Sequence, residues 1–233
     1  SMPVGDYDRR VVILSRELGK IAAFAKGARR PNSHLIGVTR PFIFGTFEVY
    51  RGRDSYTIQK ANVTNYFEEL VSDLDGVLYG YYFAELAEYY GRENLDAADM
   101  INLLYVAFKA LVNKSLPNEL VRYIYEIRLI AVNGECPDFF SCAGCGSEKE
   151  LQLYSYKENG MYCVECAASS GDGIVLQSST LYTLQYIITA PLTKLFNFVV
   201  KADVLNELKK VVNRIEFITF DKHFKSKEML DIG

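Results

Sequence analysis

Four of the five cysteines in the chain fall into two Cys-x-x-Cys pairs. Cys142 and Cys145 form the first pair, and Cys163 and Cys166 form the second, with 17 residues between the pairs. Each pair predicts a tight turn that directs two sulfurs to one point, and the intervening loop can bring the second pair to the opposite side. Four thiolates delivered in this way favour one tetrahedral, structural Zn²⁺. Because four sulfurs fill the coordination shell, the pattern argues against a catalytic metal with an open position.

Other arrangements of the cysteines stay open. Two disulfides would need an oxidising compartment, and no signal peptide is visible at the N-terminus. A thioredoxin-like redox pair would lie at the junction of a strand and a helix, whereas both pairs lie in turn-rich sequence. Cys136 precedes Pro137 and lies outside the spacing. We expect Cys136 to be a free, half-buried thiol, with exchange onto the metal as the alternative.

Residue patterns typical of catalysis are sparse. The chain has two histidines, His34 and His223, which are far from each other and from any acidic pair in the sequence. It contains no Gly-x-Ser-x-Gly, no P-loop and no Gly-x-Gly-x-x-Gly. The sequence therefore predicts a protein that is not an enzyme.

The net charge of −3 is unevenly distributed along the chain. Residues 1–65 hold 11 Lys and Arg against 5 Asp and Glu, a net charge of +6, and the remaining residues carry −9. A basic N-terminal segment on an acidic body predicts a face that binds a polyanion. The basic residues of this segment are Arg9, Arg10, Arg16, Lys20, Lys26, Arg29, Arg30, Arg40, Arg51, Arg53 and Lys60.

The basic N-terminal segment, residues 1–65, has the pattern of short strands. Apolar or alternating runs cover residues 11–14, 21–25, 42–50 and 56–63, and turn-like segments separate them. Short strands with glycine turns and no helical period indicate a small barrel. We therefore place a β-barrel domain at residues 1–65.

Helical periodicity follows in residues 66–134 and returns after the cysteine region. Asp96 is a candidate cap of a second helix, and Pro117 opens a third that ends near Asn133-Gly134. Ser178 or Ser179 can cap a later helix, and a last one spans about residues 202–217. The fold class is therefore α+β: a barrel, then a helical domain at residues 66–233 with a zinc-binding insert at about residues 135–175.

The remaining composition bounds the location of the protein. Hydrophobic residues make up 49% of the chain, but no uncharged apolar run reaches the roughly 18 residues of a membrane span. Reduced cysteines without a signal peptide predict a cytoplasmic protein. The leading Ser1-Met2 is typical of a tag remnant before the original start.

Six short motifs follow one another along the chain: Gly19-Lys20-Ile21, Ala25-Lys26-Gly27-Ala28-Arg29-Arg30, Pro41-Phe42, Gly45-x-Phe47-x-x-Tyr50, Ser141-Cys142-x-x-Cys145-Gly146 and Gly160-x-x-Cys163-x-x-Cys166. In this order and spacing the chain resembles the RecO family of bacterial recombination mediators. The resemblance extends from about Asp8 to Phe224.

The resemblance implies a fold and a function. It implies an oligonucleotide-binding (OB) barrel, a helical domain and a zinc-finger-like insert. It also implies binding of single- and double-stranded DNA, strand annealing in gap and double-strand-break repair (RecF pathway), and a nucleoid-associated location. The implied partners are RecR and the C-terminal tail of single-stranded DNA-binding protein. The chain departs from the family pattern in lacking a strand before Asp8, which would leave an exposed barrel edge, and in carrying Cys136.

A barrel of this kind binds DNA by tracking phosphates with cations while bases stack on aromatic faces. The first candidates are Lys26, Arg29 and Arg30, with Gly27 allowing the backbone close to a phosphate. Arg9, Arg10, Lys20, Arg40, Arg51 and Arg53 are further candidates for phosphate contacts. Phe42, Phe44, Phe47 and Tyr50 are candidates for stacking, although alternation places some of them in the core.

A different function stays open beside DNA binding. The acidic helical domain could dock partner proteins as an adaptor with little direct DNA contact. A groove for an acidic partner tail needs a cation beside an apolar pocket. The cations available in the later helices are Lys194, Lys201, Lys209, Lys210 and Arg214.

Overall fold

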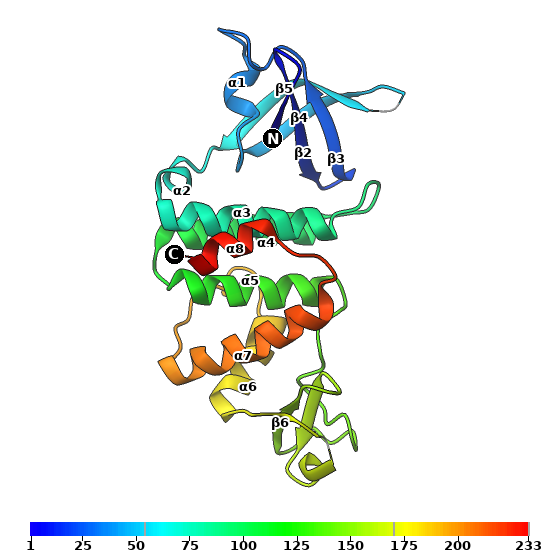
Figure 1. Ribbon diagram of the computed structural model, residues 1–233, viewed down its shortest axis with the longest axis vertical. Helices are drawn as coiled ribbons and strands as arrows, with labels where there is room; N and C mark the ends of the chain where they lie inside the picture. The colour runs from blue at the N-terminus through cyan, green and yellow to red at the C-terminus, as the bar shows by residue number, and fades with distance from the viewer. Residues whose placement is uncertain (54, 170, 233) are drawn as a thin grey trace. The chain divides into compact units, whose positions relative to one another are not determined.

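A computed structural model of the chain describes residues 1–53, 55–169 and 171–232. The chain forms two compact units, one made of Ser1–Val112 with the C-terminal segment from Phe224, and the other of Asn113–His223. The first unit contains a five-stranded sheet with helices, and the second contains helices with a small sheet around the cysteines (Figure 1). The predicted α+β class is therefore confirmed.

The sheet of the first unit has the strand order β1-β2-β3-β5-β4. Its neighbours are antiparallel except β3 and β5, which run parallel, and a short helix, α1 (Leu35–Val38), lies between β3 and β4 in the sequence. A five-stranded, partly open sheet of this kind is OB-like. The strands are β1 (Met2–Val4), β2 (Asp8–Ser15), β3 (Gly19–Ala25), β4 (Phe44–Arg51) and β5 (Tyr56–Asn65).

The residues before Asp8 differ from the sequence expectation. No strand was expected there, yet β1 pairs with β2 through Met2 opposite Arg10, Pro3 opposite Arg9 and Val4 opposite Asp8. Three residues with one proline give too weak an alternation to be recognised as a strand. Because of β1, the start of β2 is paired rather than exposed.

The barrel core follows from alternation along the strands. In β3 every second residue is buried, and Ile21, Ala23 and Ala25 pack with Val11 of β2. The intervening residues of β3, including Phe24, face outward. Tyr56 and Ile58 of β5 and Leu35 of α1 complete the same cluster.

The tip of the β2–β3 hairpin is anchored to the first helices. The Lys20 N–H donates to the Arg92 carbonyl at 3.1 Å, and the Asn94 N–H donates to the Leu18 carbonyl at 2.9 Å. Gly19 has φ +64°, and a Cβ there would lie 2.0 Å from the Arg92 carbonyl oxygen, so only glycine fits. These contacts join helices after residue 65 to the barrel in the first compact unit.

The helices of the first unit pack through aromatic side chains. Asp96 accepts the Ala98 N–H at 2.7 Å, as its predicted capping role requires. Phe224 contacts the rings of Tyr82 and Tyr89, and the Ser226 N–H donates to Glu85 at 3.1 Å. The helices are α2 (Glu68–Ser72), α3 (Leu74–Tyr90), α4 (Ala98–Asn113) and α8 (Lys225–Ile232), of which α8 was not expected from the sequence.

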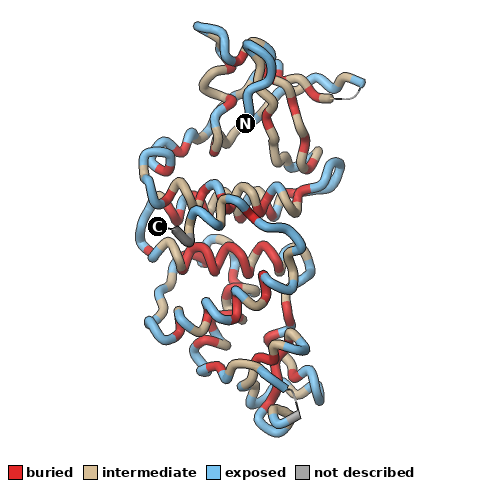
Figure 2. The backbone as a smooth tube through the Cα atoms, in the orientation of Figure 1, coloured by how far each residue is buried: buried red, intermediate tan, exposed pale blue. Residues whose placement is uncertain are grey.

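The second unit is built around α5 (Asn118–Val132), most of which is buried (Figure 2). Its C-cap is Asn133, followed by Gly134 at φ +77°, as predicted. Helix α6 (Ser178–Thr189) begins at Ser178, but its N-cap is Gln177, whose N–H donates to Glu207 at 3.0 Å. The predicted serine cap is therefore wrong. The last helix is α7 (Ala202–Thr219).

A small sheet, in the order β7-β6-β8, forms the insert between α5 and α6. The Gln185 side chain of α6 donates to the Phe139 carbonyl at 2.8 Å, and Arg214 of α7 donates to the Tyr156 carbonyl. These bonds hold the insert on α6 and α7. Its elements are β6 (Leu151–Ser155), β7 (Gly160–Cys163), the short helix η1 (Ala167–Ser169) and β8 (Gly173–Val175). Among the described helices, none is both long and apolar enough to cross a bilayer.

Candidate metal centre and nucleic-acid interface

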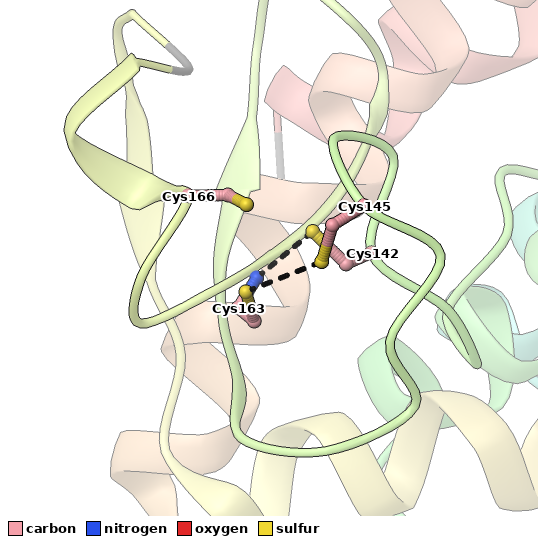
Figure 3. Close-up of side chains that lie close together, drawn as sticks. All are labelled: Cys142, Cys145, Cys163 and Cys166. Atoms are coloured by element: carbon pink, nitrogen blue, oxygen red, sulfur yellow. Dashed lines mark hydrogen bonds between the residues drawn. The ribbon is translucent and has the colours of Figure 1, made fainter.

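The four paired cysteines converge on one point, as their spacing predicts. All four Sγ atoms lie within 4.8 Å of one another, and Cys145 and Cys163 are separated by 3.8 Å between sulfurs (Figure 3). Four sulfurs at a Zn–S distance of 2.3 Å in a tetrahedron would be about 3.8 Å apart. The geometry therefore fits a metal ion held by four thiolates.

Two turns bring the sulfurs together. The Gly146 N–H donates to the Cys142 carbonyl at 2.8 Å, and the Cys166 N–H donates to the Cys163 carbonyl at 3.2 Å. The first turn lies against β7, because the Ala143 N–H donates to the Met161 carbonyl at 2.7 Å. Each pair thus follows or flanks a short strand of the insert, whose own apolar core is small.

The backbone around Cys142 stabilises its thiolate. Burial alone would raise the pKa of Cys142, but backbone N–H groups of Cys163, Cys145 and Gly144 lower it to about 6. The Cys163 N–H lies 3.4 Å from the Cys142 sulfur. A thiolate favoured by N–H donors is the form that a metal binds.

Cys136 lies outside this group. It is a free, half-buried thiol, as predicted, and burial raises its pKa to about 12. A thiol with so high a pKa remains protonated near neutral pH, which suits a structural residue better than a ligand. The structure shows no disulfide among the described cysteines.

The first candidates for phosphate contact surround one end of the barrel. Lys26 directly follows β3, and Lys26, Arg29 and Arg30 are exposed. The guanidinium of Arg30 lies 5.1 Å from the ring centre of Tyr7, and Arg29 donates to the Gly5 carbonyl at 3.1 Å. The loop after β3 and the loop between β1 and β2 therefore form one surface, which we call the basic end.

The structure gives Gly27 a role in the turn after β3. It adopts φ +67°, and its N–H donates to the Asp8 carboxylate at 2.7 Å. The amide of Gly27 is therefore occupied within the chain. Glycine serves here to form the turn and not to offer a free N–H.

The further candidates fall into several environments. Arg10 faces outward from β2, whereas Arg9 turns inward and donates to the Thr39 carbonyl at 3.3 Å. The Lys20 ammonium donates to the Glu88 carbonyl at 2.7 Å, at the other end of β3 from the basic end. Three more candidates are exposed: Arg40 after Thr39, and Arg51 and Arg53 at the β4–β5 hairpin.

Register places one row of side chains across the outer face of all five strands. Met2 pairs with Arg10, Arg10 with Phe24, Phe24 with Thr57, and Thr57 with Tyr50. Tyr50 is 64% exposed, and Phe24, Arg10 and Thr57 are half-buried. We call this set the outer row. It combines two aromatic rings with a guanidinium. Phe24 was not a candidate from the sequence, because its neighbours in the row lie on other strands.

The other aromatic candidates are directed elsewhere. Phe42 is buried and contacts the rings of Tyr81 and Phe108. The ring of Phe44 lies 4.5 Å from that of Tyr105, and Phe47 packs against the barrel core. Of the four aromatic candidates for base stacking, Tyr50 alone is exposed.

Two family descriptions together match almost the whole chain. "Recombination protein O N terminal" matches residues 1–67, and "Recombination protein O C terminal" matches residues 71–228. The chain belongs to the RecO family.

Curated RecO relatives agree in extent with these matches. A protein named "DNA repair protein RecO" from Acetivibrio thermocellus is 31% identical over 231 residues, covering 97% of this chain and 90% of the relative. Proteins of the same name from Oceanobacillus iheyensis and Bacillus subtilis are 29% and 27% identical, each over 97% of this chain and 88% and 89% of their own lengths. The RecO match begins at residue 1 and so includes β1.

Proposed function

We propose that this RecO chain is a non-enzymatic, DNA-binding mediator of recombination that anneals strands in gap and double-strand-break repair, in the RecF pathway. Relatives named as DNA repair proteins support the repair role. The observation that carries DNA binding is the OB-like barrel with cations exposed at its basic end and aromatic rings in its outer row. Work on single- and double-stranded DNA in the cytoplasm, at the nucleoid, follows from that role.

The barrel offers both parts of a single-strand site. Lys26, Arg29 and Arg30 are exposed and can meet phosphates, with Arg10, Arg40, Arg51 and Arg53 as further contacts. Bases can stack on Tyr50 and Phe24, because every base has an aromatic face. Lys20 and Arg9 are less suited to the role, since both are half-buried as well as bonded within the chain.

We assign the four cysteines one structural Zn²⁺. Bound zinc would contribute folding free energy to the insert, whose small core has few other contacts to hold it. Four sulfurs leave the metal no open position, so its chemistry is structural.

We place the docking site for a partner tail in the second unit. A cavity of about 500 Å³ lies between α6, α7 and the segment that joins them. Tyr182, Tyr186, Phe198 and Val199 are in its walls, and Lys201 and Asp203 are the charged residues that line it. Apolar walls beside an ammonium suit a tail that mixes acidic and apolar residues, such as the C-terminal tail of single-stranded DNA-binding protein. RecR is the other proposed partner. A labelled tail peptide should bind the wild type, bind Lys201→Ala and Tyr182→Ala more weakly, and bind Lys157→Ala unchanged.

Fluorescence anisotropy with single- and double-stranded oligonucleotides tests the proposed function. The wild type should bind both. The logarithm of its binding constant should fall against the logarithm of the salt concentration with a slope of about −0.7 to −0.9 per phosphate contact. The triple variant Lys26→Ala, Arg29→Ala, Arg30→Ala should bind more weakly with a shallower slope. Wild-type strength in the triple variant would argue against the basic end as the site.

The adaptor reading predicts a different result. It requires partner binding by the cavity in the second unit and no measurable DNA binding by the intact chain. That combination would replace the mediator proposal. Nuclease or ATP hydrolysis by the pure protein would contradict the non-enzymatic assignment.

A further inference from the structure

Phe217, near the end of α7, is exposed without a packing reason. The buried face of α7 consists of Val204, Leu208, Val211, Val212 and Ile215, and Phe217 stands off that face with 78% of its surface exposed. A large exposed ring contributes little to folding, because its apolar surface stays in water. The ring is therefore available to stack on a ligand.

A guanidinium is fixed between Phe217 and a second ring. Arg214 lies 5.5 Å from the ring centre of Phe217 and 5.8 Å from that of Tyr156. Arg214 also donates from Nε at 3.1 Å and from Nη2 at 2.5 Å to the Tyr156 carbonyl. Two hydrogen bonds and two ring contacts hold the charge in place before any ligand arrives, which reduces the entropy cost of binding.

The surroundings of this stack are cationic. Lys210 is exposed one turn before Arg214, so Lys210, Arg214 and Phe217 follow one face at spacings of four and three. Between Leu208 and Thr219 the sole acidic residue is Glu216, which is buried beside Arg122. Lys157, next to Tyr156, is exposed but pairs with Glu158 at 3.1 Å. Lys210 and Arg214 therefore dominate the charge of the face.

We propose that Lys210, Arg214 and Phe217 form a second contact site for single-stranded DNA, on the second unit. The inference rests on the proposed annealing function. Annealing brings two strands together. A chain with a second site, in addition to the one on the barrel, can contact both strands at once. Cations contact phosphates and the Phe217 ring stacks on a base, as in other sequence-tolerant sites for single strands.

The chemistry favours bases over the side chains of an acidic peptide. A carboxylate would contact Lys210 and Arg214 but would leave the ring of Phe217 in water. A nucleotide uses both, because it carries a phosphate and a planar aromatic base. The acidic peptide is the competing ligand that the experiment must separate.

The test compares Phe217→Ala with Phe217→Tyr in the full chain. We measure the rate at which the protein anneals two complementary oligonucleotides, and the binding of a labelled oligothymidylate in the Lys26→Ala, Arg29→Ala, Arg30→Ala background. Phe217→Ala should lower residual binding about tenfold, the loss expected for one stacked base, and should slow annealing. Phe217→Tyr keeps a ring and should behave as the wild type. Tyr66→Ala, which removes an exposed ring outside every proposed binding site, is the control and should change neither.

The outcomes separate this inference from the proposed function. If the wild-type chain binds no DNA, both the proposed function and this inference fail. If that chain binds and anneals DNA and Phe217→Ala does so equally well, only this inference is overturned. A Lys210→Ala chain that keeps full DNA binding but loses a poly-glutamate peptide would assign the face to an acidic protein segment instead. Thermal melting checks folding, and both Phe217 variants should melt as the wild type because the ring is exposed.

Discussion

Cationic side chains are held in opposite ways at the basic end of the barrel and in the interior of the second unit. Lys26, Arg29 and Arg30 are exposed at the basic end. In the second unit, Arg122 is buried with its Nε 2.7 Å from Glu126 and its Nη2 3.6 Å from Glu216. Four of the five cysteines of that unit are likewise gathered on one point.

The two settings separate binding from stability. Exposed charges contribute little to folding and are free to meet a ligand. A buried charge must be paired, and removing its partner is costly because the remaining charge stays out of water. We therefore expect substitutions at the basic end to weaken DNA binding in a folded chain, and substitutions of Arg122 or of a sulfur ligand in the second unit to reduce stability. The following experiments test this division, in order of expected effect.

Cysteine substitution should have the largest effect on stability. Cys142→Ser removes one ligand and should release zinc, since structural zinc contributes roughly 10–16 kcal/mol in isolated finger peptides. Elemental analysis and limited proteolysis at residues 135–175 provide the measurement. Cys136→Ser is the matched control and should keep one zinc per chain. Less than stoichiometric zinc in wild-type protein kept from chelators would contradict the metal assignment.

Raising the pH should destabilise the chain through Glu126. Burial, and then the neighbouring Glu216 carboxyl, raise the pKa of Glu126 from 4.5 to about 8, and Arg122 opposes this shift. The contribution to stability is therefore complete below pH 4.5 and is lost as the pH rises through about 8. The melting temperature should fall over this range by about 2–4 °C for each kcal/mol lost.

Glu126→Gln provides the control for this titration. The amide mimics the neutral carboxyl in size and cannot ionise, so the variant should show a flatter pH profile and a higher melting temperature than the wild type at pH 9. Identical profiles for the two chains would assign the pH dependence to other groups.

Removing a ring from the outer row should weaken binding of single strands without unfolding the barrel. Tyr50→Ala should cost about 1–3 kcal/mol of binding free energy if one base stacks there. Tyr50→Phe retains the ring and should bind as the wild type. Anisotropy with oligothymidylate measures both. Equal affinity for Tyr50→Ala and the wild type would remove Tyr50 from the interface.

A pair of lysines at opposite ends of β3 offers the smallest and most selective comparison. Lys26→Ala removes an exposed cation. The slope of the logarithm of the DNA-binding constant against the logarithm of the salt concentration should therefore become shallower by less than one unit. Lys20 is engaged with the Glu88 carbonyl, so Lys20→Ala should leave the slope unchanged and lower the melting temperature slightly. A larger loss of DNA affinity for Lys20→Ala than for Lys26→Ala would contradict the basic end as the DNA-binding end of the barrel.

The sequence predicted the features that depend on neighbours in the chain. The spacing of the two cysteine pairs predicted the four-sulfur group, and alternation predicted β2, β3 and β5 within a few residues. Asp96 was predicted as a cap because it acts on residues two positions away. Such signals are local, so one sequence suffices to recognise them.

Features that depend on distant residues were not predicted. Lys20 bonds to Glu88, 68 positions away, and Phe24 joins the outer row through strands on both sides. Gly27 was expected to let the backbone approach a phosphate, and its N–H donates to the carboxylate of Asp8, 19 positions away. Short elements such as β1 and α1 give too few residues for a periodic signal.

The central claim is that single-stranded DNA binds across the barrel, and photocrosslinking tests it most directly. An oligonucleotide with 5-iodouracil should form adducts at Tyr50 or Phe24, and high salt should suppress them together with binding. Mass spectrometry of the crosslinked peptides would locate the adducts. DNA that binds and crosslinks solely outside residues 1–65 would contradict the account.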